Sequence, residues 1–167
     1  MIGYALLLVL PVAMAFAAAN DLFTMKIPNK ISLALVAAFA ASALYLRLPA
    51  EQVLTYTGIG AAFLAAGFAM FSLRLLGGGD AKLMAAGALW MGPDQALMYI
   101  FYVTLFGGIL SIAILAYRKF VKNGVTLLPG WAIKLHADGS GIPYGIAIAA
   151  SALVVYPQTI WYQAWLA

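Results

Sequence analysis

The chain has no cysteine, one histidine and only five acidic residues among its 167 residues. Without cysteine it can form no disulfide, use no thiolate nucleophile and build no cysteine-ligated zinc or iron–sulfur site. One histidine and five carboxylates also leave few ligands for a metal cluster. We therefore expect neither a metal nor a cofactor, and any catalytic chemistry has to rest on the few polar side chains that remain.

Charge is scarce as well. Charged residues make up 8% of the chain and hydrophobic residues 66%, whereas soluble domains carry roughly 25% charged residues. Because so few polar side chains cannot cover a surface in water, the composition predicts an integral membrane protein surrounded by lipid. The net charge of +4 is then informative through its distribution along the chain, and we expect no nucleic-acid partner.

The sequence contains six apolar segments. They predict an all-α, polytopic membrane protein whose six transmembrane helices form one bundle, with a single domain over residues 1–167. A span needs about 20 apolar residues, so the fourth segment is short, and Gly92-Pro93-Asp94 follows it as a chain break. No basic residue precedes the first segment, which favours a retained helix over a signal peptide. The segments are Ile2–Ala19, Ile31–Leu48, Val53–Leu73, Ala81–Met91, Ala96–Tyr117 and Gly141–Tyr156.

The basic residues fix the expected orientation. With six transmembrane helices, residues 20–30, 74–82 and 118–140 lie on one side and hold eight of the nine basic residues, leaving only Arg47 on the other. The positive-inside rule makes the first side cytoplasmic and places both termini outside. A fourth segment that re-entered its own side would move four basic residues outside, so we expect six full spans.

Asp80 follows three consecutive glycines, Gly77-Gly78-Gly79, at the start of the fourth apolar segment. A carboxylate at the edge of a membrane segment is costly and usually functional, and glycine allows a sharp bend or a close approach of another chain. The alternative is a structural role, in which Asp80 is a helix N-cap and the glycines are helix-packing residues.

Asp21 is the expected partner of Asp80. It ends the first segment, and two complete spans separate it from Asp80, so both carboxylates emerge at the cytoplasmic face although they are 59 positions apart. Two adjacent carboxylates share one proton, and such a pair can hydrolyse a peptide bond by activating water and polarising the carbonyl. Alternatively, Asp21 is an interfacial carboxylate solvated by headgroup water, despite its unfavourable position at a helix C-terminus.

Other polar residues have simpler expected roles. Lys82 either contributes a positive field or a substrate contact near Asp80, or is a snorkelling lysine at a helix start. His136 is expected to be a surface residue, and Asp138 to belong to a solvated turn. The aromatic segment 161–165 is expected to anchor the chain at the outer membrane interface.

Three motifs carry a family resemblance. Gly77–Leu83 matches the pattern G-x-G-D-x-K-L, and Asp21–Asn29 matches an aspartate followed at the same distance by Ile-Pro-Asn. Ile142-Pro143-Tyr144-Gly145 is similar to a proline–glycine motif at the last helix. With six spans in this order, the chain resembles the type IV prepilin peptidases, which are membrane aspartyl proteases of the GxGD class.

The resemblance implies cleavage of the class III signal peptide of prepilins or pseudopilins at the cytoplasmic face of the inner membrane. It implies that Asp21 and Asp80 are the catalytic pair and that Gly77 and Gly79 shape the loop at Asp80, while Lys82 is our candidate substrate contact. Larger members carry a Cys-x-x-Cys insert associated with methyl transfer. Its absence makes the chain similar to the compact, peptidase-only members of tight-adherence (Flp-type) pilus systems.

Three alternatives remain at this point. An archaeal preflagellin-type peptidase would share the same motifs. A small transporter or channel would use Asp21 and Asp80 as proton or cation ligands, although such sites favour acids near the bilayer midplane. An assembly subunit that keeps the fold without activity is the third.

Overall fold

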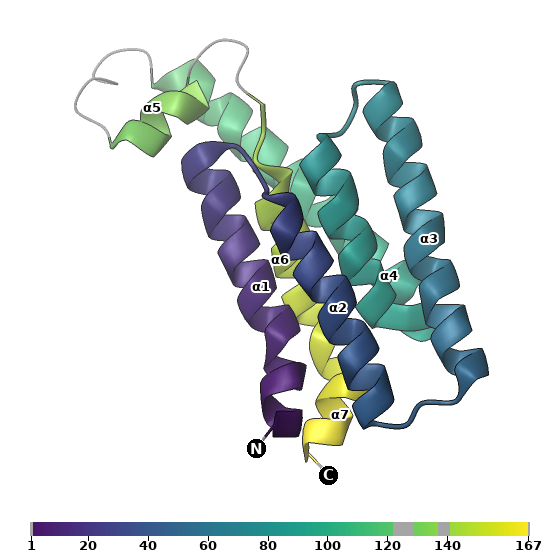
Figure 1. Ribbon diagram of the computed structural model, residues 1–167. Helices are drawn as coiled ribbons and strands as arrows, with labels where there is room; N and C mark the ends of the chain where they lie inside the picture. Colours follow the sequence, from purple (N-terminus) through teal and green to yellow (C-terminus); the bar gives the residue numbers. More distant parts are fainter. Residues whose placement is uncertain (1, 122–128, 137–140, 167) are drawn as a thin grey trace.

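A computed structural model describes residues 2–121, 129–136 and 141–166, all of them in helices or in the connections between them (Figure 1). Side chains of residues 2–7 and 165–166 are not part of the description. The helices are α1 (Ile2–Thr24), α2 (Asn29–Tyr45), α3 (Ala50–Ser72), α4 (Gly78–Phe120), α5 (Gly130–His136), α6 (Tyr144–Val155), the 3-10 helix η2 (Tyr156–Gln158) and α7 (Ile160–Leu166).

The surface of the bundle is suited to lipid. Among the described residues two helices, α3 and α4, are long and apolar enough to cross a membrane, and only 17% of the apolar window of each is buried inside the protein. Large apolar side chains such as Leu44, Leu54 and Leu97 are each more than 70% exposed. Exposed apolar surface on this scale marks contact with something other than water, so the prediction of an all-helical membrane protein is supported. The count of six spans stays a prediction.

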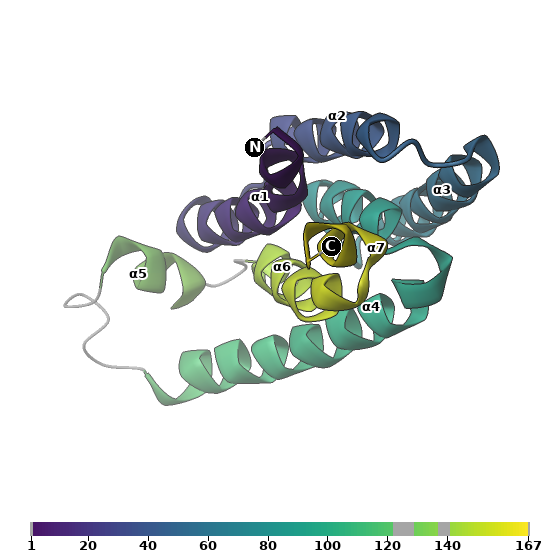
Figure 2. The same ribbon diagram turned by 90° about the horizontal axis from the view of Figure 1, so that it is seen from below.

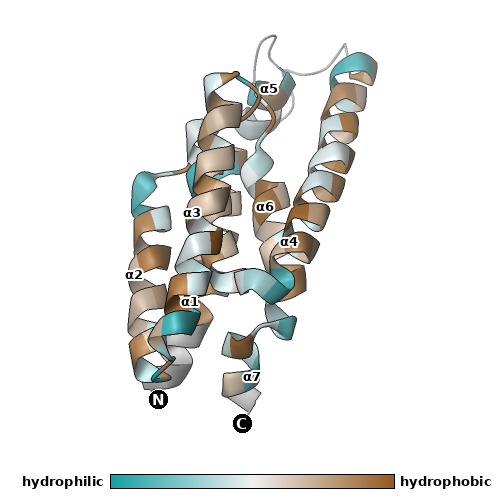
Figure 3. Cartoon of the chain, turned by 90° about the vertical axis from the view of Figure 1, so that its right-hand side faces the viewer, coloured by the Kyte–Doolittle hydropathy of each residue, from teal (hydrophilic) through white to brown (hydrophobic). Residues whose placement is uncertain are grey.

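Helix α4 is two arms joined at Gly92. This residue has φ 66° and ψ −172°, outside the helical region, and Pro93 follows it. A positive φ is readily available only to glycine, and the two helical arms meet here without an intervening loop. Figure 3 shows the longer arm of α4 at the right-hand side of the view. The break predicted at Gly92-Pro93-Asp94 is therefore present, and it divides the fourth from the fifth apolar segment.

The helices surround α6. Helix α6 packs against α1 on one side and α4 on the other, while α3 and α2 pack against α4; Figure 2 shows this arrangement from below. The last predicted segment begins later than expected, since its helix starts at Tyr144 rather than at Gly141. The α1–α2 and α3–α4 connections lie at the same end of the bundle, and the first residues of α1 and the last of α7 lie at the other (Figure 1).

The end of the bundle nearer the termini is closed by an aromatic cluster. Trp161 is fully buried, and its indole Nε1 donates a hydrogen bond of 2.6 Å to the carbonyl oxygen of Trp90. Its ring also contacts Phe39 and Tyr56 edge to face. The expectation that residues 161–165 anchor the chain at a membrane interface is therefore wrong for Trp161, because α7 folds back into the core and satisfies the indole inside the protein.

The close packing of α3 on α4 gives the first prediction. A Cβ added at Gly67 would lie 2.9 Å from the Cβ of Ala81, whereas one added at Gly58, on the same helix, meets nothing within 4 Å. Gly67→Ala should lower the free energy of unfolding by about 1–3 kcal/mol through overpacking. Gly58→Ala should raise it by about 0.5–1 kcal/mol, since alanine is the better helix former. Thermal unfolding in detergent measures both, and equal melting temperatures would contradict the packing.

Candidate active site

Asp21 lies in the last turn of α1 and is only 5% exposed. The backbone N–H of Gly145, 124 residues later at the start of α6, donates a hydrogen bond of 2.8 Å to its Oδ2. A Cβ at Gly145 would lie 2.8 Å from this oxygen and 2.8 Å from Cδ1 of Ile27. The third sequence motif, Ile142–Gly145, therefore supplies a glycine that no larger residue can replace without moving the carboxylate.

Asp80 lies in the first turn of α4. The helix begins at Gly78, and its N-cap is Gly77, with no side-chain capping hydrogen bond. The alternative that Asp80 is the N-cap is therefore wrong: its carboxylate comes three positions later, where the positive end of the helix dipole favours a negative charge. Its Oδ1 is buried and has no hydrogen-bond partner among the described residues.

The glycines before Asp80 allow two close approaches. A Cβ at Gly77 would lie 2.5 Å from Oδ2 of Asp80, and a Cβ at Gly79 would lie 3.2 Å from Cβ of Ile27. The α1–α2 connection, which follows Asp21, thus packs directly on the start of α4. These contacts explain why small residues precede the carboxylate: a side chain there would move Asp80 or push α4 away from Asp21.

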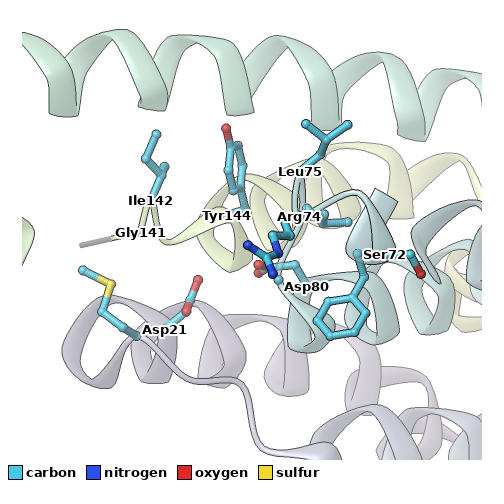
Figure 4. Close-up of a pocket in the computed structure, with 12 residues that line it drawn as sticks. Asp21, Ser72, Arg74, Leu75, Asp80, Gly141, Ile142 and Tyr144 are labelled. Carbon is cyan, nitrogen blue, oxygen red and sulfur yellow. The ribbon is translucent and has the colours of Figure 1, made fainter. Parts of the chain in front are cut away.

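Both carboxylates line one cavity of about 760 Å³, shown in Figure 4. The cavity lies between the ends of α1 and α3 and the start of α6, and its walls include Phe71, Ile142 and Tyr144. A second cavity of about 510 Å³ shares Asp21 and Asp80 and extends toward the α1–α2 connection. Two acids that are distant in sequence therefore meet in a space large enough to admit a peptide segment.

Lys82 lies outside the set of residues that line these two cavities. Its Nζ donates a hydrogen bond of 3.0 Å to Oδ1 of Asn29, the residue that begins α2. The lysine of the Asp80 motif is thereby joined to the Ile-Pro-Asn element of the Asp21 motif. This geometry gives Lys82 a role in holding the two motifs together, and the direct substrate contact predicted from sequence stays untested.

Two other residues were considered from sequence, and the structure describes one of them. His136, in α5, stacks edge to face on Tyr117 with ring centroids 5.6 Å apart, and it is not among the residues that line the cavity. Asp138 lies outside the described residues.

Two cavity residues were missed by the sequence analysis. Arg74, in the α3–α4 connection, is the only basic residue among the described residues that line the larger cavity. Its position three residues before Gly77 could have indicated a place near the site. In the sequence analysis it served only as one of the basic residues that set the membrane orientation. Tyr144 belongs to a motif that was noticed, and its hydroxyl lies 3.1 Å from Oγ of Ser111 on the second arm of α4.

Comparison with known proteins places the arrangement in a family. The model of the type IV leader peptidase family matches residues 8–112. The match covers more than half of the chain and includes both Asp21 and Asp80, and it ends before the α6 segment that bears Gly145. No curated protein and no solved structure gives a significant match. On the family match, the chain belongs to the type IV leader peptidase family.

Proposed function

We propose that the protein is an aspartic endopeptidase of the cytoplasmic membrane that removes the leader peptide of prepilins or pseudopilins. The single observation that carries this proposal is the convergence of Asp21 and Asp80 on one cavity. Their positions at the end of α1 and the start of α4 place them at one end of an apolar bundle. The family match supports a leader peptidase in general, and the geometry supports the aspartic mechanism.

In the proposed reaction the two carboxylates hold one proton between them, as close acids do. The ionised carboxylate accepts a proton from water while the water oxygen bonds to the scissile carbonyl carbon. The protonated carboxyl gives its proton to the carbonyl oxygen. In the resulting diol the C–N bond breaks, the departing amine takes up the proton that the first carboxylate accepted from water, and a diol hydroxyl returns a proton to the second carboxylate. The pair is one titrating unit, so neither aspartate is assigned as acid or base.

The placement of the site suits a substrate that is itself a membrane helix. A leader peptide joined to a hydrophobic helix brings its junction to the edge of the membrane. Asp21 and Asp80 each lie at the boundary between an apolar segment and a polar connection, which corresponds to the same level. The concentration of basic residues in the connections supports a cytoplasmic position for this edge, with both termini outside. Gly77 and Gly79 allow the close contacts that position Asp80 and the start of α4, and Lys82 holds the Asp80 motif to Asn29.

The chain is proposed to act as a peptidase without methyl transfer. The α1–α2 connection is only the short stretch between Thr24 and Asn29, so the segment between the first two helices has no room for a cysteine-bearing insert. Metal and cofactor are not part of the proposed mechanism, because water activation by two carboxylates needs neither.

The first test replaces each carboxylate by its isosteric amide. Asp21→Asn and Asp80→Asn should each lower cleavage of a purified prepilin by roughly 10²–10⁴-fold, the usual contribution of general acid–base catalysis. Mass spectrometry of the precursor after incubation in detergent gives the cut site and the rate. Asp94→Asn is the matched control. Asp94 lies just after the junction between the two arms of α4 and lines neither cavity that contains the aspartates, so this variant should cleave like the wild type. Normal cleavage by either amide variant would refute the carboxylate pair.

The second test addresses the Gly145 contact. Gly145→Ala places a methyl group against Oδ2 of Asp21 and should lower kcat by about 10²-fold, the effect of misplacing a catalytic group by about 1 Å. Gly108→Ala is the control, because a Cβ at Gly108 meets nothing within 4 Å. Both variants should insert into membranes normally. Equal kcat values for the two variants would show that Asp21 does not depend on its position beside Gly145.

A further inference from the structure

Arg74 occupies a backbone position that favours glycine. It follows the end of α3 with φ 59°, in a helix-ending turn closed by hydrogen bonds of 2.9 Å from its own N–H to Phe71 O and from Leu75 N–H to Met70 O. Glycine is the usual residue at this place in such a turn, since a Cβ is disfavoured at positive φ. A long cationic side chain at this point therefore carries a backbone cost that the turn itself does not explain.

The arginine side chain belongs to the cavity of the two aspartates. It lines the cavity together with Asp80, and in the view of Figure 4 its guanidinium group overlaps the Asp80 carboxylate. Among the residues that the structure describes, no hydrogen bond or ion pair engages this side chain. Its five N–H donors are thus available to a molecule in the cavity.

The other side-chain donors of the cavity are already used. The hydroxyl of Ser72 donates to Phe68 O at 2.9 Å, and the hydroxyl of Tyr144 pairs with Ser111. The remaining walls are the two acids, which share a single proton between them, and apolar side chains such as Met25, Leu75 and Ile142. Arg74 is therefore the one lining side chain in the described chain that can donate several hydrogen bonds into the cavity.

A peptide substrate needs such donors. A scissile bond inside a helix is shielded by its own hydrogen bonds, so the substrate has to unwind around the cut, and the freed carbonyl groups lie at a membrane edge where water is limited. Backbone groups left without partners there cost free energy. A planar guanidinium group, which offers several N–H donors in a fixed geometry, can satisfy two carbonyl oxygens of an extended strand.

We propose that Arg74 is a substrate-binding residue that donates hydrogen bonds to the backbone carbonyls of the substrate where it unwinds beside the scissile bond. The inference rests on the proposed peptidase function and adds to it the residue that receives the unwound backbone. Because the contact is to the backbone, the arginine recognises an extended peptide of any sequence rather than a particular side chain.

Because Arg74 has a positive φ, replacing it by glycine should lower activity without lowering stability. Arg74→Gly removes the side chain and relieves the positive φ, so the melting temperature should stay the same or rise. The value of kcat/KM for a synthetic peptide with a basic leader and the start of a hydrophobic helix should fall roughly 10- to 100-fold, mostly through KM, as expected for lost charge-assisted hydrogen bonds. Arg74→Lys should restore only part of the loss.

Arg47 provides the matched control. It follows the end of α2 with φ 52°, in a turn with the same hydrogen-bond pattern, from Arg47 N–H to Leu44 O and from Leu48 N–H to Ala43 O. It lines neither cavity that contains the aspartates. Arg47→Gly should therefore change the melting temperature as Arg74→Gly does and leave KM and kcat at the wild-type values.

The outcomes separate this proposal from the function on which it rests. Binding of the same peptide to Asp80→Asn protein, whose slow cleavage leaves time to measure it, should weaken roughly 10-fold or more when Arg74→Gly is added. Unchanged KM and unchanged binding would overturn the role of Arg74 while cleavage by the wild type still upheld the peptidase. A shifted pH profile of kcat with unchanged KM would overturn it too, since the arginine would then act on the aspartates. No cleavage by the wild type would instead refute the function itself.

Discussion

The hydrogen bond from Gly145 N–H to Asp21 joins α6 to α1, and the arrangement of the site depends on it. Asp21 is almost completely buried at the end of α1, where the helix dipole opposes a negative charge. A backbone donor from α6 offsets part of that cost and fixes the direction of the carboxylate. Because α6 also packs on α4, the same contact sets the position of Asp21 relative to Asp80.

Close packing at glycines also positions the helices that carry the two carboxylates. Gly79 lets the start of α4 meet Ile27 in the connection after Asp21, and Gly67 lets α3 lie directly against Ala81. Each glycine lies where a methyl group would separate two elements that carry or support a carboxylate. The hydrogen bond between Lys82 and Asn29 adds a polar link between the same two motifs. At the other end of the bundle, the buried Trp90 and Trp161 hold α4 and α7 together.

Much of this arrangement follows from local sequence. Hydropathy is a local property, so the apolar segments and the break at Gly92 could be predicted, and counting spans between Asp21 and Asp80 was enough to expect both at one end. Contacts that depend on the packed bundle could not be predicted. Trp161 was expected at an interface and is buried, because its partner Trp90 lies 71 residues away. Arg74 was missed because its place in the cavity depends on how the end of α3, the start of α4 and the start of α6 come together around it.

The central claim is that Asp21 and Asp80 face each other across one cavity, and the absence of cysteine makes a direct measurement possible. In the double variant Asp21→Cys/Asp80→Cys, the only two thiols of the protein lie at the positions in question. A short bifunctional thiol reagent, followed by mass spectrometry, should join them within one chain. The pair Asp21→Cys/Asp94→Cys should carry two separate labels. Equal cross-linking of both pairs, or none in the first, would contradict the account.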